Sequence, residues 1–209
     1  MITKNAIKNK GFSLVELLIA SSIGLIAIGI VGSVFLSGYT SANQRSLELL
    51  LKQDVNDALS LLKEDILRAG YNKDKNTSYI VSGATEIVTI DTSKPTKHCI
   101  SYAYHDGTVQ HLRSFYTKMG EDSEDNDVRV LRLYSTTNPV RDSDDFCDDG
   151  ESILDQNVIE VNDFTLRSEA LSSGSATSRL ITITLAANLI ANPSISIAKS
   201  VQVKTRNWQ

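Results

Sequence analysis

Lys10-Gly11-Phe12-Ser13-Leu14-Val15-Glu16 opens a run that stays apolar as far as Leu36, and this stretch decides the organisation of the chain. Between Phe12 and Leu36 the only charged residue is Glu16. A helix of about 20 apolar residues spans the hydrocarbon core of a bilayer. The run therefore predicts a membrane-spanning helix, which we place at residues 12–38.

The residues before this helix contain Lys4, Lys8 and Lys10 and no acidic residue. Basic residues that flank a membrane helix favour the cytoplasmic side. We therefore expect a cytoplasmic N-terminus, a single pass through the membrane, and the rest of the chain outside the cytoplasm.

Glu16 needs an explanation, because a carboxylate inside a membrane helix is costly and usually has a functional partner. If the chain is cut after Gly11, Glu16 lies about one helical turn from the new amino terminus. The ammonium group formed there could pair with Glu16 in the same chain or in a neighbour. The alternative is an uncut signal anchor in which Glu16 reaches the lipid head groups.

Residues 10–20, KGFSLVELLIA, resemble the class III signal of type IV prepilins and of type II secretion pseudopilins. The resemblance implies cleavage by prepilin peptidase, with Gly11 as the last residue of a leader at 1–11. It implies further that Phe12 becomes the N-terminus and is N-methylated, and that Glu16 is the carboxylate used in assembly. The chain would then cross the inner membrane once, with its C-terminal part in the periplasm, before it enters an extracellular pilus.

The charge of the chain is negative and unevenly placed. Loss of residues 1–11 removes three lysines and changes the formal charge from -4 to -7. The segment 121–149 carries ten acidic residues against three arginines, so the negative charge is concentrated there. Nucleic-acid binding needs a basic surface, and we therefore expect no direct contact with nucleic acid.

Two parts of the acidic segment, residues 122–127 and 142–149, carry oxygen-bearing side chains of the kind that calcium prefers. Neither part has the glycine at the sixth position and the glutamate at the twelfth that an EF-hand loop requires. We interpret both as solvated loops, and we expect no tight calcium site, no other metal and no cofactor.

Cys99 and Cys147 both fall outside the cytoplasm in this topology. An even pair of cysteines in an oxidising compartment predicts a disulfide. Closing a loop of this length stabilises a fold by roughly 4 kcal/mol in the chain-entropy model. The alternative is a pair of buried free thiols.

Apolar residues continue after Leu36 with a helical period. No proline occurs between Phe12 and Gly70, so the pattern predicts one helix of about 58 residues, roughly 87 Å long, that Gly70 ends. Its second half, residues 39–70, is amphipathic, and we place Asp65 with the other charged residues on the solvent face. The predicted apolar stripe consists of Leu47, Leu50, Leu51, Val55, Ala58, Leu59, Leu62 and Ile66.

Residues 71–209 have the alternation and the turn signals of strands. Asp106-Gly107 predicts a two-residue hairpin turn, and Ser172–Ser175 predicts a flexible loop. A long helix followed by hairpin-linked strands favours an α+β fold, with an antiparallel sheet packed on the helix stripe. The strands are expected at 86–90, 99–105, 108–116, 128–134, 157–167, 179–186 and 195–204.

The second part of the chain resembles PilW-type minor pilins. The similarity lies in LLKEDILRAGY at 61–71, in CISYAY at 99–104, in the segment 148–167 that follows the second cysteine, and in VQVKTRNWQ at 201–209. It implies a minor type IV pilin that works with other minor pilins, the major pilin and the inner-membrane assembly platform. The J-type minor pseudopilin of type II secretion is the nearest alternative, and a membrane-anchored receptor domain is a more distant one.

The chain has no convergent set of reactive groups that would indicate an enzyme. The histidines His98, His105 and His111 lie in or beside predicted strands of different register, and we interpret them as polar surface residues. No glycine-rich phosphate loop and no zinc motif occurs. We therefore expect a substrate of prepilin peptidase rather than an enzyme.

Overall fold

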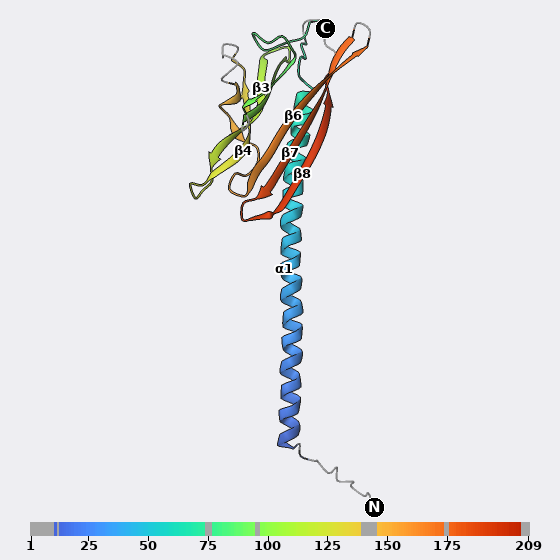
Figure 1. Cartoon of the computed structure of the whole chain (residues 1–209), viewed down its shortest axis with the longest axis vertical. Coiled ribbons are helices and arrows are strands. Elements are labelled where there is room, and N and C mark those ends of the chain that lie inside the picture. Colours follow the sequence, from blue (N-terminus) through green and yellow to red (C-terminus); the bar gives the residue numbers. More distant parts are fainter. Residues whose placement is uncertain are drawn as a thin grey trace, which may run out of the picture. The chain divides into compact units, whose positions relative to one another are not determined.

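The computed structural model describes residues 11, 13–73, 77–94, 97–138, 146–173 and 176–205, without the side chains of 172–177. The chain divides into two compact units, Met1–Ser46 and Leu47–Gln209. Helix α1 (Leu14–Ile66) runs through the boundary between them, and strands β1 to β8 all belong to the second unit (Figure 1).

In the first unit α1 is apolar on all sides and uncovered. Large side chains such as Leu25, Ile28 and Phe35 are each 71% exposed. The helix is long and apolar enough to cross a membrane, by length and composition. It has no break among these residues, in agreement with the absence of proline. Such a surface needs lipid or other apolar helices around it.

In the second unit one stripe of α1 is buried, as its period predicts. The exceptions are Leu47, which is partly buried, Leu50, which is 45% exposed, and Asp65, which is only 3% exposed. Asp65 was wrongly predicted on the solvent face; it lies three residues after Leu62, and the strands extend far enough around the helix to cover it. The buried apolar members of the stripe are Leu51, Val55, Ala58, Leu59, Leu62 and Ile66.

Helix α1 ends at Ile66, four residues before the predicted stop. The next residues form tight turns, and Gly70 has a left-handed φ of 77°. The N–H of Gly70 donates to the carbonyl of Ala103 at 2.9 Å, and the N–H of His105 donates to the carbonyl of Tyr71 at 2.8 Å. The chain therefore leaves the helix early because its main chain hydrogen-bonds to the end of strand β2.

The strands form two antiparallel sheets, where the sequence predicted one. The first has five strands in the order β1-β2-β3-β4-β5 and the second has three in the order β6-β7-β8. The α+β class is confirmed. Strand bounds in the first sheet are β1 Val88–Lys94, β2 Lys97–His105, β3 Gln110–Glu121, β4 Asp127–Thr136 and β5 Glu151–Ser152, and in the second they are β6 Ile159–Ser173, β7 Ala176–Leu189 and β8 Asn192–Lys204.

A bulge keeps β6 apolar on one face. The pairing with β7 shifts between Val161 and Asp163, so that Asn162 has no opposite residue. Val161 and Phe164 are both buried as a result, although three positions separate them. Strands β6 and β7 also extend to Ser173 and Ala176, so residues 172 and 173 of the predicted loop are strand, while residues 174–175 lie outside the described residues.

The hairpin between β2 and β3 is present, but its loop has four residues, 106–109, instead of two. The Asp106 carboxylate accepts hydrogen bonds from the N–H groups of Thr108 at 2.7 Å and Val109 at 2.9 Å. Gly107 has a left-handed φ of 98°. The aspartate side chain thus holds a longer turn closed, a role that residue counting between strands does not reveal.

The main core lies between the second half of α1, one face of the five-stranded sheet and one face of the three-stranded sheet. Ile100, Tyr102 and Phe115 come from the first sheet and Ile181 and Ile183 from the second, all at 0% exposure. A smaller apolar cluster covers the other face of the five-stranded sheet. Since this sheet is buried on both faces, the alternation of its strands is imperfect.

The buried carboxylate of Asp65 ties α1 to the five-stranded sheet. It accepts hydrogen bonds from the Tyr102 hydroxyl on β2 and from the Arg113 guanidinium on β3, each at 2.6 Å. Burial and the neighbouring carboxylate raise the pKa of Tyr102 well above its ordinary value, so this hydroxyl stays a donor. A buried charge is tolerated only when it is paired and hydrogen-bonded, and here two strands supply its partners.

A disulfide joins Cys99 on β2 to Cys147, with 6.0 Å between their Cα atoms. This is the pairing that the sequence predicts. The segment 146–150, which we call the strap, crosses the outer face of β3 and β4. Side chains of these strands donate to strap carbonyls, including Tyr116 to Asp149 at 2.7 Å and Arg132 to Gly150 at 3.0 Å. The strap therefore covers the smaller apolar cluster.

Removing one donor to Asp65 should destabilise the fold. We expect Tyr102→Phe to lower the free energy of unfolding by about 1–3 kcal/mol, the usual effect when a buried polar group loses its partner. Urea unfolding of the full chain in detergent measures the change. Tyr104→Phe is the matched control, since its hydroxyl forms no hydrogen bond within the described residues; equal effects of the two changes would contradict the assignment.

The disulfide should contribute strongly to stability. Reduction is expected to lower the free energy of unfolding by up to about 4 kcal/mol, because the reduced unfolded chain gains conformational freedom. Urea midpoints with and without dithiothreitol measure the effect. The double variant Cys99→Ser plus Cys147→Ser should have the urea midpoint of the reduced protein, and dithiothreitol should not change that midpoint. A wild-type midpoint that dithiothreitol leaves unchanged would contradict the prediction.

Candidate functional site

The candidate site is the start of α1. Gly11 is exposed and outside the helix, which begins at Leu14. Residues 1–10 and Phe12 lie outside the described residues, so the structure does not bear on the rest of the predicted leader. A Cβ added to Gly11 would meet nothing within 4 Å. The described chain thus has no steric need for a glycine at this position.

Glu16 has a partner within its own chain. Its carboxylate accepts a hydrogen bond from the main-chain N–H of Ser13 at 2.9 Å, while the Leu17 N–H donates to the Ser13 carbonyl at 3.1 Å. This is the return half of a capping box, in which a glutamate satisfies the amide of the residue three positions earlier. The Ser-x-x-Glu spacing at 13–16 is the signal for it, and the sequence reasoning missed it.

The capping contact meets only part of what Glu16 requires. The side chain is exposed in the single chain, and its neighbours Leu14, Val15 and Leu17 are between 60% and 73% exposed. A negative charge near a helix N-terminus is favoured by the helix dipole. In an apolar environment, however, one neutral hydrogen bond does not neutralise the charge. The position therefore remains suited to a cationic group from outside the helix.

The described histidines take part in local structure. His98 Nδ1 lies 2.5 Å from the Phe164 carbonyl, and His111 Nε2 lies 2.9 Å from the Asp106 carboxylate. The N–H of Gly107 donates to His105 Nδ1 at 3.1 Å. These contacts join strands or close the hairpin loop, so the interpretation of the three residues as plain surface groups was too simple.

The structure describes the first of the two predicted acidic loops, residues 122–127. The Asp122 carboxylate accepts hydrogen bonds from the side-chain amide of Asn126, from the main-chain N–H of Asn126 and from that of Glu124, and these bonds lower the pKa of Asp122. Its oxygens close the turn between β3 and β4. Within the described residues no group of three or more His, Cys, Asp or Glu side chains could hold a metal ion. Residues 142–145 of the second acidic part lie outside the described residues.

Comparison with known proteins gives two family matches. The model described as prokaryotic N-terminal methylation motif matches residues 7–32, which include Gly11 and Glu16. The model described as prepilin peptidase-dependent protein B matches residues 44–205. No match was found among the curated proteins or among the solved structures.

The two matches cover the signal at the start of the chain and the domain that follows it. The first confirms the prepilin-type signal, and the second covers most of the chain and nearly all of its second unit. Together they confirm the resemblance to type IV pilins, whose role is structural. The chain belongs to the family of prepilin peptidase-dependent protein B, as a pilin-like protein with an N-terminal methylation motif.

Proposed function

We propose that the chain is a minor type IV pilin of the PilW kind, cut between Gly11 and Phe12 by prepilin peptidase and then built into a filament. The observation that carries the proposal is the methylation motif at residues 7–32, which includes much of the uncovered apolar part of α1. The motif accounts for the glycine, and assembly accounts for the helix surface.

Processing creates a positively charged partner for Glu16, which the capping contact with Ser13 does not supply. Cleavage leaves Phe12 as the N-terminus, which becomes N-methylated and carries a positive charge. Glu16 lies about one turn further along the helix, and it accepts this cation from a neighbouring subunit. Relief of an incompletely paired charge in lipid then favours transfer of the subunit into the filament. The N–H of Ser13 remains available as a second donor.

The location and the partners follow from this mechanism. Lys4, Lys8 and Lys10 keep the leader in the cytoplasm. Residues 39–209 lie in the periplasm, where the disulfide forms, and later on the outside of the pilus. The partners are prepilin peptidase, the inner-membrane assembly platform, other minor pilins and the major pilin. If deletion of the gene abolishes pili and twitching and leaves protein secretion intact, the result supports a type IV pilin. If deletion impairs protein secretion and leaves pili and twitching intact, it supports a type II secretion pseudopilin.

Gly11→Ala should block leader removal, because the peptidase must bind the chain closely at the residue before the cut. The chain itself has open space at this position, so the variant folds normally. The mass of the membrane-extracted protein measures whether the leader is present. Gly24→Ala, which also meets open space, is the control and should be cut. Normal processing of Gly11→Ala would contradict the proposal.

Glu16→Gln should remove the negative charge at this position and keep the capping hydrogen bond from the Ser13 N–H. Glutamine also accepts a hydrogen bond in a capping box, so insertion and leader removal should continue. Incorporation into sheared pili should fall about tenfold or more, since each 1.4 kcal/mol of lost pairing changes an equilibrium tenfold. Immunoblots of sheared and cell fractions give the ratio. Wild-type incorporation of this variant would show that the charge is not what drives assembly.

A further inference from the structure

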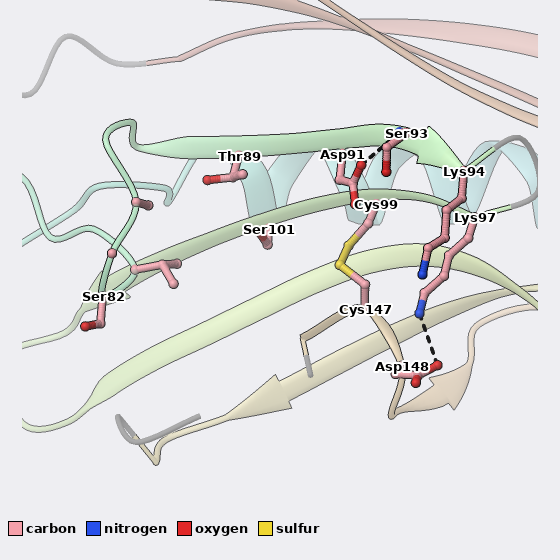
Figure 2. A pocket seen from close by; sticks show the side chains of 13 residues that line it. Ser82, Thr89, Asp91, Ser93, Lys94, Lys97, Cys99, Ser101, Cys147 and Asp148 are labelled. Carbon is pink, nitrogen blue, oxygen red and sulfur yellow. Dashed lines mark hydrogen bonds and ion pairs between the residues drawn. A yellow bond between two sulfur atoms is a disulfide. The ribbon is translucent and has the colours of Figure 1, made fainter. Parts of the chain in front are cut away.

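The cavity shown in Figure 2 selects no class of ligand. It has a volume of about 620 Å³, and its charged lining residues are two lysines, Lys94 and Lys97, and two aspartates, Asp91 and Asp148. Lys97 pairs with Asp148 at 3.1 Å, and the Asp91 carboxylate accepts a hydrogen bond from the main-chain N–H of Ser93 at 2.8 Å. The charges of this lining balance, and the volume alone does not say what the cavity holds.

Another cavity, of about 490 Å³, lies where α1 ends beside strand β2, and we call it the helix-end cavity. Three of its six lining side chains are apolar or aromatic. This mixture and this volume are typical of ligand pockets, and they leave room for one long side chain together with the main chain that carries it. The lining consists of Glu64, Leu67, Arg68, Tyr71, Tyr104 and Asp106.

Tyr104 brings an unsatisfied polar group to this cavity. The residue is only 6% exposed, and its ring stacks on that of His111 with 4.6 Å between the ring centroids. Its hydroxyl has no hydrogen-bond partner within the described residues. The hydroxyl is also not fully enclosed, because the enclosed side-chain atoms without a partner there belong to Arg113, Arg129 and Arg132. Since Tyr104 lines the cavity, its hydroxyl is available to a ligand from that side.

Two carboxylates stand beside this hydroxyl in the lining. Glu64 is exposed and has no ion pair or hydrogen bond within the described residues. The Asp106 carboxylate accepts hydrogen bonds from the Val109 N–H, from His111 and from the Thr108 N–H, which lower the pKa of Asp106 and keep it ionised. The charge of Asp106 is therefore fixed in place, whereas that of Glu64 has no counterion.

The basic residues nearby do not cancel both carboxylates. Arg68 is the only basic residue in the lining, and its ion pair within the described residues is with Asp65, at 4.0 Å. Asp65 itself pairs more closely with Arg113, at 2.6 Å. Lys73 packs its side chain against Gly107, but it is not part of the lining. The lining therefore has two carboxylates, one guanidinium and an excess of one negative charge.

We propose that the helix-end cavity binds the side chain of an arginine from another protein. The guanidinium donates to the carboxylates of Glu64 and Asp106 and to the hydroxyl oxygen of Tyr104, and its alkyl chain packs against Leu67 and Tyr71. A guanidinium suits three separate acceptors and aromatic neighbours, because it has five donors in one plane and is weakly hydrated. A lysine ammonium is a compact and strongly hydrated charge. The proposal does not depend on the filament assignment.

Peptide binding to the full chain in detergent tests the chemistry. Saturation-transfer NMR compares three blocked tripeptides, which carry arginine, citrulline or lysine between two glycines. We expect saturable binding of the arginine peptide and at least about fivefold weaker binding of the citrulline peptide, which keeps the shape and lacks the charge. Absence of saturable binding, equal binding of the citrulline peptide, or tighter binding of the lysine peptide or of free agmatine would overturn the proposal.

Variants of the lining locate the binding site. Glu64→Gln should weaken binding of the arginine peptide at least about fivefold, and Tyr104→Phe should weaken it without changing the urea midpoint. Arg68→Gln should strengthen binding, because it removes the competing cation. Asp57→Asn also removes one negative charge from α1, but it lies outside the lining and should leave binding unchanged. Binding that is insensitive to Glu64→Gln, or that Arg68→Gln weakens, contradicts the assignment.

Photocrosslinking in cells identifies the source of the arginine. The full chain carries p-benzoylphenylalanine in place of Ser60, which is exposed about one helical turn before Glu64. We expect an adduct with a different protein, through a peptide that contains arginine, and Glu64→Gln should reduce this adduct. The same probe in place of Ser196, exposed on β8, is the positional control and should give no such adduct. No adduct, or an adduct only between two copies of this chain, would overturn the proposal; leader removal on the same gel tests the proposed function separately.

Discussion

The rest of the structure depends on helix α1, whose two parts require different surroundings. The first part of α1 exposes apolar side chains on every side, whereas the second part buries a single stripe under two sheets. The two parts therefore depend on different sources of apolar cover. The second part obtains its cover from the strands that follow in the same chain. The first part can obtain it only from lipid or from other helices, which makes association with a membrane or with other subunits a physical requirement.

Within the second unit, polar contacts determine how the sheets are fixed to the helix. Asp65 offers one buried carboxylate to donors on β2 and β3, so the helix end and the five-stranded sheet keep a defined register. On the other face the disulfide and the strap hold a second, smaller cluster closed.

The sequence predicts those features that depend on local pattern. The continuous helix, the strand positions, the α+β class and the pairing of two cysteines follow from period, turn residues and cysteine number. Two features depended on information that is not local. Asp65 is buried because distant strands bring a tyrosine and an arginine to it. The strands separate into two sheets because of long-range packing. The longer loop at 106–109 is a local effect, because the Asp106 side chain accepts hydrogen bonds from amides two and three residues later. The capping contact of Glu16, in contrast, was visible in the Ser-x-x-Glu spacing.

The proposed function requires that the chain is cut between Gly11 and Phe12 before α1 enters a filament. The most direct measurement is the intact mass of the protein purified from the membranes of cells that make it, with N-terminal peptides sequenced by mass spectrometry. The account predicts a chain that begins at a methylated Phe12 and lacks residues 1–11. A chain that begins at Met1, with the leader attached, would contradict it and would leave a domain held by a simple membrane anchor.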